Sequence, residues 1–118
     1  MKAIQISEFG GPDVMNLVEL PDPIAGDGEI LLDVTAIGIN YADTHQTENS
    51  YLSAQTLPLV PGIEVVGTNS GKRYLASVSS GGYASKAVAH RGVSFPIPDG
   101  VTDEQALCML VQGTTAWH

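Results

Sequence analysis

The sequence predicts a mainly β fold, a small barrel or rolled sheet of short strands followed by one helix. About seven short runs of alternating or apolar residues are spread over most of the chain. Thirteen glycines and seven prolines separate these runs, which suits frequent turns. A sustained helical period appears only after Val101. With 118 residues, 43% of them hydrophobic, the chain has room for one domain with one core.

Three alternating runs lie in the first third of the chain. Isoleucines that alternate with polar neighbours predict a strand over residues 2–7, and a second run covers 15–20. The clearest strand covers 29–39, and one of its faces is apolar throughout. Its other face is polar at the start and apolar toward Ile37, so we expect this strand to run from an exposed end into a core.

The period of two is lost over residues 40–48. We expect a helical turn there, beginning near Asn40 or Asp43, and then a polar loop over 49–60. Four further short strands follow, and Asn69-Ser70-Gly71 is a good hairpin turn between the first two of them. These strands are predicted over residues 63–68, 73–78, 83–89 and 93–97.

A helix is predicted from Thr102 to the end of the chain. Thr102 and Gln105 fit a capping box, and apolar residues then recur at helical spacing. Cys108 lies in this apolar stretch and is expected to be a buried small hydrophobe. No capping glycine, proline or polar tail ends the pattern, so we expect the sequence to be a piece of a longer protein.

Charge and cysteine content exclude several classes of function. Thirteen acidic and five basic residues give a formal net charge of −8, which repels phosphate backbones and anionic lipid heads, so neither nucleic acid nor membrane is an expected partner. The first residues are not expected to form a signal peptide, and no apolar run is long enough to span a membrane. One cysteine excludes an internal disulfide framework and favours a cytoplasmic location.

Three polar residues could carry chemistry. Asn40 and Asp43 follow the longest strand, where sites are commonly built, but both could simply cap a helical turn. Glu64 lies inside an apolar strand and must be hydrogen-bonded or paired if it is buried. It could be a general base, a metal ligand or a structural anchor, and the structural role is favoured.

Other chemistries find little support. The candidate zinc ligands Cys108, His45, His90 and His118 are widely spaced and form no zinc motif, so zinc is not expected. No glycine pattern matches a nucleotide-binding loop, and Gly81-Gly82 has the context of a turn. No nucleophile motif is present.

The order of the motifs resembles the N-terminal, GroES-like domain of the medium-chain dehydrogenases/reductases. The resemblance covers essentially the whole chain and is closest to the zinc-free quinone oxidoreductase branch. The segments that carry it are 1–4, 9–14, 28–32, 38–43, 57–67, 81–84, 97–101 and 113–116.

The resemblance implies a partly open β-barrel with short helices, and a set of site residues. In the zinc-dependent branch a cysteine stands at the position of Asn40 and a histidine at that of Ile63, so the resemblance implies no zinc here. Asn40 is implied to lie at the interdomain cleft near nicotinamide and substrate, and Thr115 to contact the nicotinamide end of the cofactor.

Three further positions follow from the same resemblance. Tyr41 is a cleft residue, and His45 stands where an aromatic residue is common, so the chain departs from the family pattern there. Asp43 and Glu64 are structural polar residues. In this branch NAD(P)H gives a hydride to a quinone or a conjugated carbonyl, and the hydride chemistry belongs to the cofactor.

The family's second half is a Rossmann domain, which is absent from these 118 residues. We therefore expect a barrel domain over residues 1–101 and, over 102–118, the start of the helix that leads to the cofactor domain. The parent protein would be an NAD(P)H-dependent oxidoreductase, and the isolated chain would be an inactive monomer that binds no cofactor tightly. One alternative is a free-standing GroES-like binding or assembly module with a mobile loop over 46–60, and another is a zinc alcohol dehydrogenase domain.

Overall fold

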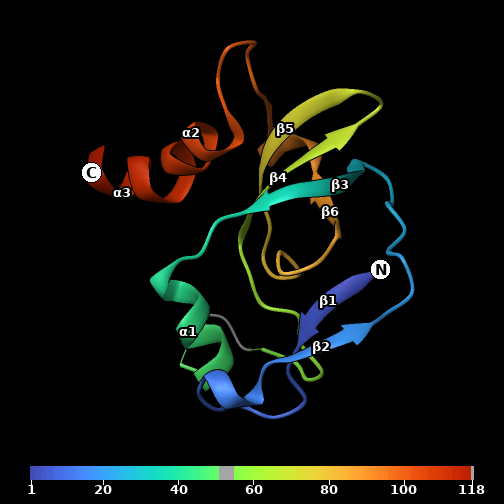
Figure 1. The fold of residues 1–118 in the computed structure, drawn as a ribbon, viewed down its shortest axis with the longest axis vertical. Helices are drawn as coiled ribbons and strands as arrows, with labels where there is room; N and C mark the ends of the chain where they lie inside the picture. Colours follow the sequence, from blue (N-terminus) through green and yellow to red (C-terminus); the bar gives the residue numbers. More distant parts are fainter. Residues whose placement is uncertain (51–54, 118) are drawn as a thin grey trace.

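The computed structural model describes residues 1–50 and 55–117. In these residues the chain forms a curled antiparallel sheet, a separate two-stranded sheet, one helix beside them and a C-terminal helical arm (Figure 1). The strands are β1 Lys2–Gln5, β2 Asn16–Glu19, β3 Glu29–Ile37, β4 Glu64–Asn69, β5 Lys72–Ser77, β6 Lys86–His90 and β7 Ser94–Pro96. The helices are α1 Tyr41–Glu48, α2 Asp103–Leu107 and α3 Thr114–Trp117, with single 3₁₀ turns at Pro12–Val14 and Arg91–Val93. His118 and residues 51–54 of the predicted polar loop lie outside the described residues.

The larger sheet has the strand order β6-β3-β4-β5-β7, and every pairing in it is antiparallel. It curls into a half-barrel, and the β1-β2 pair lies across its open side (Figure 1). Bridges between Ala3 and Ala84 and between Ile6 and Leu59 tie β1 to the rest of the fold. The prediction of a mainly β, partly open barrel with a C-terminal helix is confirmed.

Two apolar clusters use opposite faces of β4, because neighbouring side chains of a strand point to opposite sides. Val65 faces the inside of the curled sheet, and Val66 faces the helical arm. The inner cluster consists of Ile30, Leu32, Val65, Ala76, Ala87 and Ala89. The outer cluster joins Val66 and Leu75 to Ala106 of α2. The second cluster is what positions the C-terminal arm on the sheet.

The turn between β4 and β5 agrees with its sequence. Ser70 and Gly71 have φ values of 50° and 79°, and Asn69 pairs with Lys72. Two successive residues with positive φ form the kind of turn that matches the twist of a hairpin. This predicted turn is confirmed.

The end of β3 differs from the expectation. Ile37 and Ile39 are exposed, so the second face of this strand does not enter a core. The reason is that β6 pairs with β3 only along residues 29–33 and then turns away. Beyond Asp33, β4 is the strand that remains paired with β3.

The C-terminal helix also differs from the expectation. It begins after Thr102 with the predicted capping box, in which Thr102 Oγ1 accepts from Gln105 N (3.1 Å) and Gln105 Oε1 accepts from Thr102 N (3.0 Å). It is not one regular helix, because residues Cys108–Gly113 form a π-helical segment between α2 and α3. Cys108 is exposed rather than buried, since it lies on the side of the arm that faces away from the sheet cluster.

Candidate functional site

A buried polar cluster lies where β3 ends, α1 begins and the C-terminal arm crosses the sheet. Asn40 is at its centre and is only 5% exposed. Its Nδ2 donates to Glu64 Oε1 (3.2 Å), and its Oδ1 accepts from Gln112 Nε2 (2.8 Å). The side chain of Asn40 therefore joins the sheet to the π-helical segment.

Glu64 is held by contacts on both sides of its carboxylate. Its residue is 1% exposed, and besides the contact with Asn40, its Oε2 accepts from the backbone N–H of Val111 (3.0 Å). Gly38 makes room for this carboxylate, because a Cβ at position 38 would lie 2.1 Å from Glu64 Oε1. The described contacts of Glu64 are those of a hydrogen-bonded anchor between β4 and the arm.

Asn40 and Asp43 together cap helix α1. Asn40 is the N-cap residue, and Asp43 Oδ2 accepts from the Asn40 backbone N–H (3.0 Å) as part of a capping box. The interpretation that both residues cap a helical turn is thus confirmed. The Tyr83 hydroxyl donates to the same Oδ2 (2.5 Å), and the second oxygen, Oδ1, is buried without a hydrogen-bond partner among the described residues.

The environment of Tyr83 alters its acidity. Burial is the main cause that raises the pKa of the Tyr83 hydroxyl above its ordinary value, and the hydrogen bond to Asp43 and the nearby carboxylate charge raise it further. The phenol therefore stays protonated and acts as a donor to Asp43 at neutral pH.

Tyr41 and His45 lie on the outer side of α1. Tyr41 is 79% exposed, and its ring meets the half-buried His45 ring edge-on at a centroid distance of 4.9 Å. His45 Nδ1 is 2.8 Å from Ser50 Oγ. These two side chains are within reach of a molecule outside the chain, but the described contacts do not join them to the Asn40 cluster.

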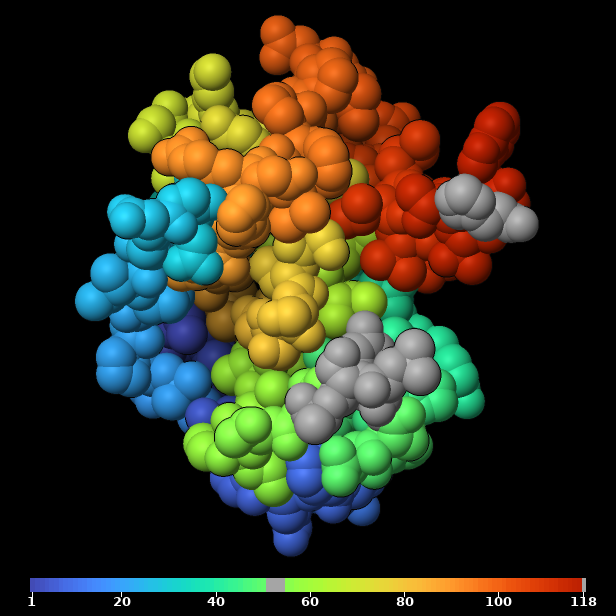
Figure 2. Space-filling model, turned by 180° about the vertical axis from the view of Figure 1, so that it is seen from behind, coloured from blue at the N-terminus to red at the C-terminus, as the bar shows by residue number. Residues whose placement is uncertain are grey.

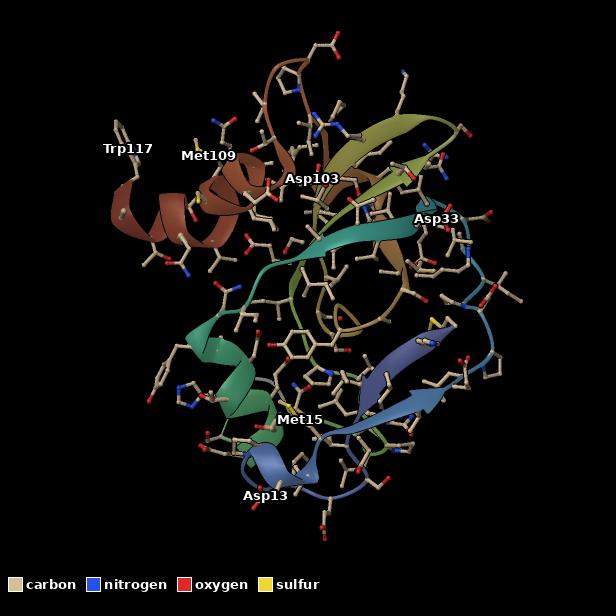
Figure 3. All side chains as sticks on the ribbon, in the orientation of Figure 1. Asp13, Met15, Asp33, Asp103, Met109 and Trp117 are labelled. Carbon is tan, nitrogen blue, oxygen red and sulfur yellow. The ribbon has the colours of Figure 1, made fainter. Side chains whose placement is uncertain are left out.

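Thr115 lies on α3, three residues after Gln112. It is exposed, and no hydrogen bond to its hydroxyl is present among the described residues. The arm projects from the body of the molecule (Figure 2), and Trp117 points away from the sheet (Figure 3). Met109 borders a pocket together with Leu75 and Phe95 of the sheet. Met109 is 65% exposed and Trp117 is 88% exposed, which leaves the arm open to a further surface.

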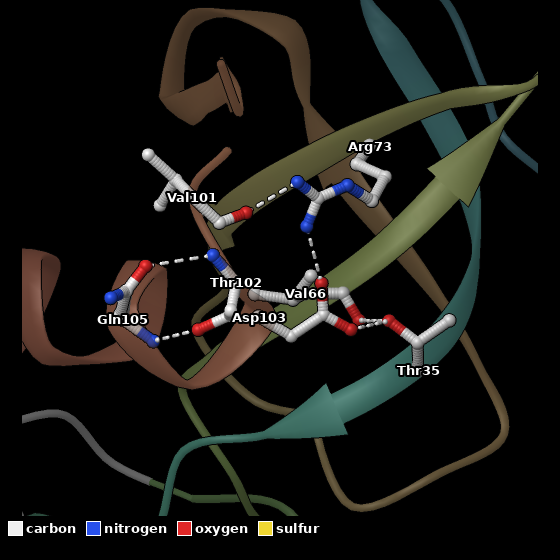
Figure 4. Close-up of polar contacts among 7 residues, drawn as sticks. All are labelled: Thr35, Val66, Arg73, Val101, Thr102, Asp103 and Gln105. Atoms are coloured by element: carbon white, nitrogen blue, oxygen red, sulfur yellow. Dashed lines mark hydrogen bonds and ion pairs between the residues drawn. The ribbon is translucent and has the colours of Figure 1, made fainter. Parts of the chain in front are cut away.

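The arm is also attached at its beginning by a second polar network (Figure 4). Arg73 of β5 donates to Asp103 Oδ1 (2.8 Å) and to the carbonyl oxygen of Val101 (2.5 Å). Thr35 of β3 donates to Asp103 Oδ2 (2.8 Å). The Arg73 guanidinium, and then Thr35, hold the pKa of the Asp103 carboxyl below its usual range.

An apolar groove of about 550 Å³ lies between β1 and the end of β3. Its lining is mostly aliphatic, and it includes Ile37 and Ile39, which the curled sheet leaves uncovered. The groove offers packing surface, and Tyr83 is the residue that it shares with the Asn40 cluster.

The described part of the chain shows neither a metal cluster nor a membrane-spanning helix. No group of three or more His, Cys, Asp or Glu side chains that could hold a metal ion is found within residues 1–50 and 55–117. No helix in these two ranges is long and apolar enough to cross a membrane.

Sequence patterns identified only part of this cluster. Asn40, Asp43 and Glu64 were predicted, and the structure brings them together. The sequence does not identify Gln112 and the Val111 amide as part of the cluster. Both lie in the π-helical segment, and a helical period of apolar residues does not indicate where a π-helical turn occurs. Tyr83 appeared only as a residue of a predicted strand.

Comparison with known proteins finds a matching family model and curated relatives. Residues 26–73 match the alcohol dehydrogenase GroES-like domain family. The human (Homo sapiens) quinone oxidoreductase is 32% identical over 131 aligned residues, which cover 100% of this chain and 40% of that protein.

Solved structures agree. The quinone oxidoreductase from Thermus thermophilus, solved also in complex with NADPH, has a TM-score of 0.92 and 40% identity over 99% of this chain and 39% of its own. The Escherichia coli quinone oxidoreductase complexed with NADPH has a TM-score of 0.91 and 26% identity over 99% of this chain and 39% of its own. The chain thus spans about 40% of the length of the relatives that it matches. The predicted resemblance to the N-terminal GroES-like domain of the quinone oxidoreductase branch is confirmed.

Proposed function

We propose that this chain, similar along its whole length to the N-terminal part of quinone oxidoreductases, is the substrate-side domain of an NADPH-dependent enzyme that reduces a quinone or a conjugated carbonyl. In this proposal residues 1–101 form the barrel domain and residues 102–118 begin the connection to a Rossmann domain that binds the cofactor. The isolated chain is then inactive, because it has no glycine-rich loop for the pyrophosphate.

The observation that carries the proposal is the hydrogen bond between Asn40 and Gln112 (2.8 Å). It brings the end of β3 beside the helical arm that bears Thr115. Asn40 and Thr115, which the resemblance implies to lie near the nicotinamide, therefore belong to elements that are fixed to each other.

The side chains fit the uncharged carboxamide of a nicotinamide. Thr115 offers a hydroxyl that is exposed and free of partners among the described residues. Asn40 uses one of its two Nδ2 hydrogens on Glu64, so a second N–H remains. When bound, the cofactor supplies the hydride, and the protein orients it and excludes water.

A zinc-free site is the second part of the proposal. Asn40 and Ile63 stand where the zinc-dependent branch has a cysteine and a histidine, and an amide and an aliphatic side chain are poor zinc ligands. Asn40 Nδ2 is moreover turned toward Glu64 as a donor. We also propose that Tyr41 and His45 line the substrate side of the cleft, because both can contact a molecule outside the chain.

Two experiments test the function. The purified chain, mixed with NADPH and a benzoquinone, should show neither NADPH oxidation nor tight NADPH binding, and saturable quinone reduction would contradict the proposal. Sequencing the gene beyond codon 118 should reveal a βαβ unit with a glycine-rich turn, whose product should oxidise NADPH with a quinone. A stop codon there would favour the binding or assembly module. Zinc in the purified protein would favour the zinc alcohol dehydrogenase domain.

The location and state of the chain are proposals as well. A single free thiol suits a cytoplasmic protein, and we propose that the 118-residue chain is a monomer. Size-exclusion chromatography with light scattering measures its mass directly.

A further inference from the structure

We infer that Glu64 is a positioning residue, whose carboxylate fixes both the π-helical turn of residues 108–113 and the orientation of the Asn40 amide. The inference concerns the geometry of the chain itself and does not depend on the proposed reaction. Its two parts rest on the two oxygens of the same buried carboxylate.

The first part concerns the helix. In an α-helix the N–H of Val111 would bond to the carbonyl four residues earlier, whereas a π-helical turn uses the carbonyl five residues earlier. Here the Val111 N–H donates to Glu64 Oε2 (3.0 Å), which lies outside the helix. An acceptor outside the helix thus takes over one amide within the π-helical segment Cys108–Gly113. Such wide turns are uncommon and occur frequently at functional sites.

The second part concerns the amide of Asn40. Both oxygens of the Glu64 carboxylate accept from N–H groups, and the group of Asn40 that faces Glu64 Oε1 is its Nδ2. The Oδ1 of Asn40 must then face Gln112, whose Nε2 donates to it. Glu64 therefore sets the direction of the hydrogen bonds that run from Gln112 through Asn40 to Glu64, and Gln112 at the end of this series is exposed.

The surroundings are built for a carboxylate in this place. Gly38 leaves the space that Glu64 Oε1 occupies, and the Gly38 N–H donates to the backbone carbonyl of Glu64 (3.0 Å). Both carboxylate oxygens have donors, as a buried acid requires. Helix α3, which bears Thr115, directly follows the π-helical segment, so its position depends on the turn that Glu64 stabilises.

The test compares Glu64→Gln with Glu64→Leu in the 118-residue chain by NMR. The glutamine keeps one acceptor for the Val111 N–H, but its new NH₂ group faces Asn40. The amides of Asn40 and Gln112 must then both turn over, which is possible because Gln112 is exposed. We expect Val111 to stay protected from exchange, while the Gln112 side-chain NH₂ loses its acceptor and exchanges at least about tenfold faster.

The leucine variant offers no acceptor. We expect the backbone chemical shifts of residues 108–113 to change and the arm to lose its fixed position. Glu104→Gln is the matched control, since it removes one negative charge from an exposed position of the same arm. The inference is overturned if the Gln112 side-chain NH₂ exchanges at the same rate in Glu64→Gln as in the wild type. It is also overturned if a folded Glu64→Leu keeps the wild-type shifts over 108–113. If Glu64→Leu does not fold, the glutamine variant alone decides.

Discussion

The Arg73 guanidinium lies 2.8 Å from the Asp103 carboxylate and ties the beginning of helix α2 to strand β5 (Figure 4). Both side chains are less than one-third exposed, and Thr35 and the Val101 carbonyl complete their hydrogen bonds. This network and the Asn40–Glu64–Gln112 cluster hold the C-terminal arm at two separate places.

Removing the cation should loosen the arm. Arg73→Met leaves Asp103 with one donor fewer and frees the Val101 carbonyl, so we expect a loss of about 1–2 kcal/mol in the free energy of unfolding. Urea denaturation measures it. Lys72→Met is the control, because Lys72 is an exposed cation on the same strand, and equal losses in the two variants would contradict the role of the pair.

The same pair predicts a dependence on acid. The pKa of Asp103 is lower in the folded chain than its ordinary value of 3.8, so its contribution is complete well above pH 3.8 and is lost as the pH falls through the folded pKa. We expect the stability difference between wild type and Arg73→Met to shrink below about pH 4. Urea midpoints at a series of pH values test this, and a constant difference down to acid unfolding would oppose it.

Gly38 should tolerate no side chain. A Cβ there would lie 2.1 Å from Glu64 Oε1 and 2.9 Å from its Cδ, so Gly38→Ala must displace the carboxylate from Asn40 and Val111. Because buried donors then lose their acceptor, we expect a loss of about 2–4 kcal/mol. Gly11→Ala is the control, since a Cβ at Gly11 meets no atom within 4 Å. Thermal unfolding should separate the two variants clearly.

Tyr83 should behave as a buried donor. Tyr83→Phe removes a donor from Asp43 Oδ2 while Oδ1 is already without a partner among the described residues, so a loss of about 1–2 kcal/mol is expected. Tyr41→Phe, at an exposed position, should change little.

Alkaline pH gives a second measurement on Tyr83. Its pKa is raised in the folded chain, so its contribution to stability is complete below the ordinary value of 10.0 and is lost as the pH rises through the folded pKa. Phenolate absorbance should therefore show one tyrosine that ionises only together with unfolding, and Tyr83→Phe should remove that step. A Tyr83 that ionises in the folded chain near pH 10 would refute the buried contact.

Thr115 should contribute to cofactor binding and not to the stability of the fold. Because its side chain is exposed and has no partner among the described residues, Thr115→Ala should alter the stability of the chain by less than about 0.5 kcal/mol. In a protein extended by the proposed cofactor domain, the same change should raise the KM for NADPH. An unchanged KM would remove Thr115 from the proposed site.

Local patterns determined the strands, the hairpin at Ser70-Gly71 and the capping box at Thr102, because period, turn residues and caps act within a few neighbouring residues. They also marked Asn40, Asp43 and Glu64 as polar residues at unusual places. Which of them would meet, and in which orientation, was decided only by the fold. Contacts such as Asn40–Gln112 join residues 72 positions apart, and no local pattern records them. The π-helical turn shows this best, because the sequence predicts a regular helix there. In the fold, the Val111 N–H of this turn donates to the buried carboxylate of Glu64, which lies 47 positions away in the sequence.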